Sequence, residues 1–111
     1  MQKFYEVQIE GKGGHASMPR KANNPIIIGA ELISQLCSIP QAILENQAEP
    51  GVRVIGFEAG EKGNIIPGRA RIRVELYAEN EELFGSIRSK FFRFSKKNAE
   101  AYDAVAEIDE I

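Results

Sequence analysis

The chain has 111 residues and a formal net charge of −2, and 43% of its residues are hydrophobic and 27% charged. These values are ordinary for one globular domain and leave little room for a second. The slightly acidic balance gives no basic surface for nucleic acid, and the sequence has no run of about 18 apolar residues that would span a membrane. We therefore expect residues 1–111 to form a single domain with neither a nucleic acid nor a membrane as partner.

The only cysteine, Cys37, excludes an internal disulfide framework and favours a reducing, cytoplasmic location. Cys37 lies in an apolar stretch that predicts a helix, so we expect its side chain to be buried. The first residues begin a strand pattern at once and show no signal peptide.

The first half of the chain predicts a strand, a loop and a helix. Residues 3–10 alternate between apolar and polar side chains, which indicates a half-buried strand. Asn24 and Pro25 are typical of an N-cap and a first helical residue. Pro40 is expected to end or kink this helix, with a last turn resuming through Gln47. The stripe that we expect to be buried consists of Ile26, Ala30, Ile33 and Cys37, widened by Ile27, Leu36 and Ile39.

The second half predicts two strands, a helix and a final strand. Residues 52–58 form the second strand, residues 59–68 a loop, and residues 69–78 a third strand with strict alternation. Asn80 is expected to cap the second helix. The buried stripe of that helix is expected at Leu83, Ile87, Phe91 and Phe94, with Phe84 beside it, and the last strand at Ala104, Ala106 and Ile108.

The element order β-α-β-β-α-β predicts an α+β, ferredoxin-like fold, with a four-stranded antiparallel sheet and both helices on one face. The strands are then arranged 4-1-3-2, so residues 52–58 form an edge strand. Apolar residues with little charge on an edge favour pairing with another chain. On the outer face of the sheet, Arg69, Arg71 and Arg73 are expected to face Glu6, Glu10 and Glu107.

The segment from Gly11 to Pro19 contains the only histidine, His15. Glycines around it allow backbone conformations that bring the imidazole close to a ligand. A lone histidine cannot build a catalytic metal centre, so we interpret the chain as part of an active site. Asn64 in the second loop is another candidate, although His15 could equally be a plain surface residue and Asn64 a turn residue.

Two other patterns are weaker. Residues 11–16 match the G-x-G-x-x-A dinucleotide pattern, but the helix begins too late and no second parallel strand follows. The element order is also that of an RNA-binding module, but the third strand has one tyrosine and three arginines instead of a run of stacking aromatics. Neither nucleotide nor RNA binding is favoured.

Three motifs together resemble the dimerisation, or lid, domain of the dizinc exopeptidase and amidohydrolase family, which includes carboxypeptidases and aminoacylases. The motifs are Gly11-Lys-Gly-Gly-His-Ala-Ser-Met-Pro19, the helix start Asn24-Pro25, and Gly63-Asn-Ile-Ile-Pro67 before a strand. The resemblance covers roughly residues 3–111, and the first motif is most similar to the N-acyl amino acid amidohydrolase branch.

This resemblance implies that the domain belongs to a larger metallohydrolase acting on N-acyl amino acids or small peptides, and that it catalyses nothing alone. It implies two zinc or similar divalent ions in the parent catalytic domain and none in residues 1–111. It implies a homodimer through residues 52–58 and the first helix. His15 would then polarise the scissile carbonyl in the partner's active site, and Asn64 and Gly14 would contact substrate.

One position departs from the family pattern. Many members place an arginine near the end of the strand after the Asn-x-Ile-Pro motif, and here that position is Tyr77. Tyrosine cannot form the bidentate ion pair that arginine forms with a carboxylate. The alternative interpretation of the whole chain is a stand-alone ferredoxin-like interaction or small-molecule-binding module, in which His15 is only a loop residue.

Overall fold

The computed structural model describes residues 1–39, 51–60 and 63–111. Pro40 and the turn expected through Gln47 lie outside these residues. The elements follow the expected order, with two short strands and a short 3-10 helix in addition. They are β1 (Gln2–Glu10), β2 (Gly14–His15), η1 (Pro19–Lys21), α1 (Pro25–Leu36), β3 (Val52–Ala59), β4 (Ile65–Ile66), β5 (Arg69–Tyr77), α3 (Glu81–Ala101) and β6 (Val105–Glu110).

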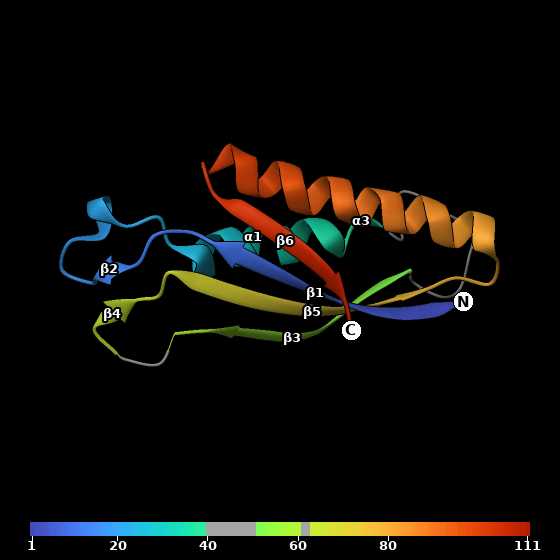
Figure 1. Ribbon diagram of the computed structural model, residues 1–111, viewed down its shortest axis with the longest axis horizontal. Coiled ribbons are helices and arrows are strands. Elements are labelled where there is room, and N and C mark those ends of the chain that lie inside the picture. Colours follow the sequence, from blue (N-terminus) through green and yellow to red (C-terminus); the bar gives the residue numbers. More distant parts are fainter. Residues whose placement is uncertain (40–50, 61–62) are drawn as a thin grey trace.

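The main sheet is antiparallel and has the strand order β3-β5-β1-β6. This order confirms the predicted arrangement and places β3 at one edge. Both helices cover the same face of the sheet (Figure 1), which confirms the α+β fold. β2 and β4 pair with each other beyond one end of the main sheet. No helix in the described part of the chain is long and apolar enough to cross a membrane.

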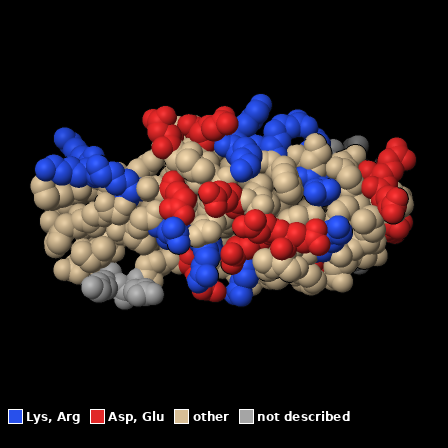
Figure 2. All heavy atoms as spheres, in the orientation of Figure 1, with Lys and Arg blue, Asp and Glu red and all other residues tan. Residues whose placement is uncertain are grey.

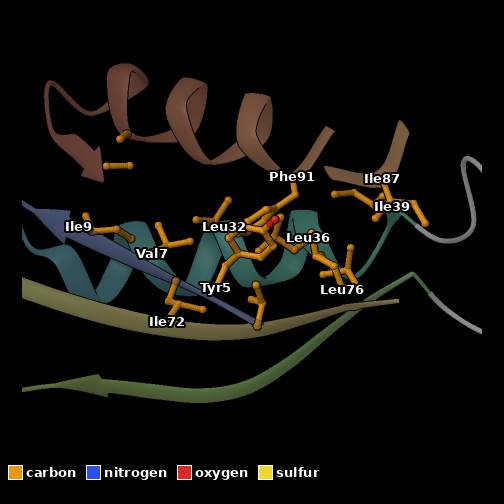
Figure 3. Close-up of a cluster of buried hydrophobic side chains, with 14 of the residues drawn as sticks. Tyr5, Val7, Ile9, Leu32, Leu36, Ile39, Ile72, Leu76, Ile87 and Phe91 are labelled. Carbon is orange, nitrogen blue, oxygen red and sulfur yellow. The ribbon is translucent and has the colours of Figure 1, made fainter. Parts of the chain in front are cut away.

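The core lies between the sheet and the helices, because strict alternation turns one side of each strand toward them. Figure 3 shows side chains of β1 and β5 meeting those of α1 and α3. The two helices are also joined by a polar contact, in which Asn98 Nδ2 donates to the Ile28 carbonyl at 2.9 Å. The largest fully buried side chains are Tyr5, Val7, Ile9, Ile28, Leu32, Leu36, Ile39, Ile72, Val74, Leu76, Ile87 and Phe91.

The buried stripe of α1 differs from the predicted one. Ile28, Leu32 and Leu36 are buried, whereas Ile27 and Cys37 are exposed. Ile26 and Ala30 are exposed as well, and Ile33 is half-buried. The helix has apolar residues on more than one side, so periodicity allows two orientations. Close packing selects one of them, because a Cβ on Gly29 would lie 2.8 Å from the ring of Phe57 on β3.

The prediction for α3 is nearly correct. Ile87 and Phe91 are fully buried, and Phe84 is buried while Leu83 and Phe94 lie at the margin of the core. Both predicted N-caps are confirmed, because the side chain of Asn24 accepts from the Ile26 N–H and that of Asn80 from the Leu83 N–H. The helices thus begin where the sequence indicates.

β1 begins at the end of the main sheet that lies away from β2 and β4, and residue 111 lies beside Phe4, near the start of β1. β6 runs beside β1, and the Ile111 N–H donates to the Phe4 carbonyl at 2.9 Å. β1 then runs away from this end to the loops that carry β2 and β4 (Figure 1). The molecule therefore has a chain-end side and an opposite side, along a longest dimension of 48 Å.

Candidate functional site

The side opposite the chain ends is formed by residues 11–24 and 63–68, which we call the tip. Here β2 and β4 form a two-stranded sheet in which His15 pairs with Ile65. The Ala16 N–H donates to the Asn64 carbonyl at 3.0 Å. Backbone hydrogen bonds therefore hold together the two loops that carry the predicted site residues His15 and Asn64. The sequence did not predict this small sheet, because two-residue strands leave no alternation to detect.

The base of the tip is fixed to the rest of the domain. Lys12 and Asn23 exchange two backbone hydrogen bonds of 2.8 and 2.7 Å, and the Gly11 N–H donates to the Gly68 carbonyl at 2.9 Å. Asn23 Nδ2 also donates to the Tyr102 carbonyl at 2.5 Å. The Tyr102 hydroxyl donates to Glu31 on α1, and this hydrogen bond, more than burial and the charge of Glu31, raises the pKa of Tyr102. The tip is thus joined to the C-cap of α3, which in turn contacts α1.

Two neighbouring glycines in the tip differ in what surrounds them. A Cβ on Gly13 would lie 2.6 Å from the Ile66 carbonyl oxygen and 2.9 Å from the Gly68 nitrogen. A Cβ on Gly14, the predicted substrate contact, would meet only the Ala22 Cβ at an ordinary 3.6 Å. Gly13 is therefore the residue that lets the two loops approach closely. The sequence signal for it was the Gly-Gly pair before His15.

His15 is exposed, and one ring nitrogen faces its own loop. The Ser17 N–H donates to Nδ1 at 3.1 Å, and Ser17 Oγ lies 2.7 Å from the same nitrogen. Within residues 1–39, 51–60 and 63–111, no hydrogen bond reaches His15 Nε2 or the Asn64 amide group. Both groups are therefore available to a ligand at the surface of the tip.

Positive charge gathers at the tip. Figure 2 shows lysines and arginines over β2 and η1 at the left end, whereas both signs are mixed elsewhere on this face. Lys12, Arg20 and Lys21 are exposed, and none of them forms an ion pair with another described residue. An uncompensated basic surface attracts anionic ligands.

The positive charges of the arginines on β5 are compensated by glutamates on neighbouring strands. Arg69 pairs with Glu10 at 2.7 Å, which confirms one expected contact. Arg73 lies opposite Glu6 in the β1–β5 register, as expected. Its ion pair and that of Arg71 are nevertheless with Glu58 on β3, each at 3.1 Å, and not with Glu6 or Glu107. Glu58 lies opposite Arg71 in the β3–β5 register. A hollow of about 310 Å³ beside these residues is thus lined by neutralised charges.

Tyr77 lies far from His15 within one chain. β5 begins at Arg69 beside the tip and ends at Tyr77, which pairs with Gln2 at the chain-end side. Eight residues of strand rise about 27 Å. Tyr77 and His15 of one chain therefore cannot contact the same small substrate.

No group of three or more His, Cys, Asp or Glu side chains among the described residues could hold a metal ion. The described residues thus fit no metal centre, and no metal chemistry is assigned to them.

The chain belongs to the peptidase dimerisation domain family, whose model matches residues 2–103. It is 33% identical over 105 residues to the hippurate hydrolase of Campylobacter jejuni, covering 95% of this chain and 27% of that relative. It is 36% identical over 104 residues to the N-acetyldiaminopimelate deacetylase of Lactiplantibacillus plantarum, covering 90% and 26%. The chain thus spans about a quarter of the length of these relatives.

Solved structures show the same fold. The aminobenzoyl-glutamate utilization protein of Klebsiella pneumoniae is 24% identical, with a TM-score of 0.84 over 98% of this chain and 27% of that one. A hydantoinase/carbamoylase family amidase of Burkholderia ambifaria is 14% identical, with a TM-score of 0.87 over 99% and 27%.

Proposed function

We propose that this chain is the lid and dimerisation domain of a metal-dependent amidohydrolase that cleaves the amide bond of N-acyl amino acids or small peptides. The family match and the relatives support this class, since they include two named deacetylases or hydrolases and an N-acyl-L-amino acid amidohydrolase of Geobacillus stearothermophilus. We assign two zinc or similar divalent ions to the parent catalytic domain, which would activate the water and polarise the carbonyl. A cytoplasmic location is part of the same proposal and rests on the single cysteine.

The length of the relatives favours a domain of a longer protein over the stand-alone module. The relatives are about four times as long as the matched segment.

The proposed dimer interface consists of β3 and the exposed side of α1. Ile55 and Phe57 on β3 are 49% and 38% exposed, and Ile26 and Ile27 on α1 are 37% and 59% exposed. A two-fold pair with all helices on one face would join two β3 strands antiparallel into one sheet of eight strands. This pairing covers the free edge of β3 together with four large apolar side chains.

Antiparallel pairing explains how His15 would act in the partner's site. The two sheets would point in opposite directions, so the tip of each chain would lie beside the chain-end side of the other. Each His15 would then lie near the Tyr77 position of the other chain. It would also approach the partner's catalytic domain. This arrangement removes the conflict caused by the roughly 27 Å between the two ends of β5, which separates Tyr77 from the tip of its own chain.

The single observation that carries the proposal is the pairing of the His15 and Asn64 loops into one rigid tip. In the proposed mechanism, His15 donates a hydrogen bond to the scissile carbonyl and stabilises the oxyanion, and Asn64 and Gly14 contact substrate.

The direct test of this role is His15→Ala in the full-length protein. Loss of one preorganised oxyanion donor should lower kcat about 10²- to 10³-fold with little change in KM. The isolated domain should keep its unfolding midpoint, because His15 is exposed. A variant with normal kcat would contradict the catalytic role.

The dimer interface is tested by Ile55→Lys, which adds charge at a bulge of the edge strand. We expect monomers in sedimentation velocity. Val105→Lys is the matched control, since Val105 is 56% exposed on β6, the opposite edge of the sheet. An unchanged dimer in the first variant, or monomers in the second, would show that the interface lies elsewhere.

A further inference from the structure

We propose that Ser17 fixes the tautomer and orientation of His15, so that the imidazole presents Nε2–H as a hydrogen-bond donor. The proposal deepens the function proposed above and rests on it for its catalytic meaning. The tautomer and orientation of His15 are inferred from the geometry of the tip alone.

A turn of the backbone places Ser17 next to His15. The Met18 N–H donates to the His15 carbonyl at 2.9 Å, so residues 15–18 form a β-turn with Ala16 and Ser17 at its centre. The Ala16 N–H is bound by the Asn64 carbonyl. The turn is therefore fixed on both sides, and Ser17 is held close to the imidazole of His15.

The direction of the next hydrogen bond determines where the ring proton lies. A backbone N–H can only donate, so the 3.1 Å contact from the Ser17 N–H requires a lone pair on His15 Nδ1. The Ser17 hydroxyl, 2.7 Å from Nδ1, can donate its proton to the same nitrogen. In the neutral imidazole the proton must then be on Nε2.

The consequence concerns what His15 can bind. With its proton on Nε2, the exposed edge of the ring is a donor. It can neither accept a proton as a general base nor ligate a metal through that nitrogen. The ligand group that it suits is a carbonyl oxygen or an oxyanion, and Ser17 is a positioning residue for that contact.

Because His15 is the only histidine, ring ¹⁵N spectra of the labelled 111-residue chain report on it without overlap. In spectra of the neutral imidazole we expect Nδ1 to resonate as the unprotonated nitrogen and Nε2 as the protonated one. A spectrum with the proton mainly on Nδ1 would overturn the proposal.

The role of the hydroxyl is tested by Ser17→Ala, with Ser17→Thr as the conservative variant. In Ser17→Ala we expect the ring shifts to move toward those of an unstructured histidine peptide and ring relaxation to show greater mobility, whereas Ser17→Thr should retain both properties. Ser89→Ala, at an exposed position of α3, is the matched control and should change neither. Wild-type tautomer and mobility in Ser17→Ala would refute the positioning role.

In the full-length protein, Ser17→Ala should lower kcat about fivefold at unchanged KM, the size expected for one neutral hydrogen bond, and Ser17→Thr should restore it. The spectra decide the Ser17 proposal without any activity. If the spectra agree with it but His15→Ala leaves kcat unchanged, the proposed function fails instead.

Discussion

The helix-covered part of the sheet and the tip are stabilised by different interactions. In the first, apolar side chains from β1, β5 and the helices are removed from water, and most of the folding free energy arises there. In the tip, both predicted site residues are exposed, and backbone hydrogen bonds and one close glycine contact determine the conformation. Because the core and the tip are stabilised separately, the tip can present polar groups to a ligand without lowering the stability of the core.

The largest expected effect belongs to the core side of α1. Leu32→Ala should lower the free energy of unfolding by about 3 kcal/mol, because it leaves a cavity at a fully buried position. Ile27→Ala on the exposed side of the same helix should cost less than about 0.5 kcal/mol. Both are measured by urea unfolding in the Ile55→Lys background, in which the proposed dimer would be monomeric. Equal costs would show that the assignment of the buried stripe is wrong.

The tip should respond to a substitution that leaves the core intact. Gly13→Ala forces the β2 and β4 loops apart, at a cost of about 1–2 kcal/mol, so amide exchange at Ala16 should accelerate about 5- to 30-fold. Gly14→Ala is the matched control and should leave that rate nearly unchanged, since its Cβ has room. The comparison fails if the two variants exchange at the same rate.

The smallest effect is expected at a polar atom within the core. The Tyr5 hydroxyl is buried, and it has no hydrogen-bond partner in the described part of the chain. Tyr5→Phe should therefore be neutral or raise the free energy of unfolding by up to about 1 kcal/mol, because no hydrogen bond is lost. A clear loss of stability in thermal or urea unfolding would reveal a partner for this hydroxyl.

The sequence predicted the main sheet because the residues of β1 and β5 alternate between apolar and polar side chains, and because the helices carry recognisable caps at Asn24 and Asn80. It did not predict which side of α1 is buried, since the apolar residues of that helix satisfy two orientations and the contact between Gly29 and Phe57 depends on tertiary packing.

At the tip, the motifs identified His15 and Asn64 as candidates, but their proximity depends on the pairing of two residues in each of two distant loops. The contact between Ser17 and His15 Nδ1 depends on a turn within the loop that residue types alone do not fix. Local pattern therefore identified the residues, and only the folded backbone shows which hydrogen bonds they form.

The measurement that tests the central claim most directly mixes two inactive variants of the full-length protein. One carries His15→Ala, and the other has its catalytic glutamate replaced. If His15 acts in the partner's site, a mixed dimer contains one complete site, and activity should return to a fraction of the wild-type level. Demonstrated subunit exchange without any return of activity would contradict the claim and assign His15 to its own subunit or to the loop alone.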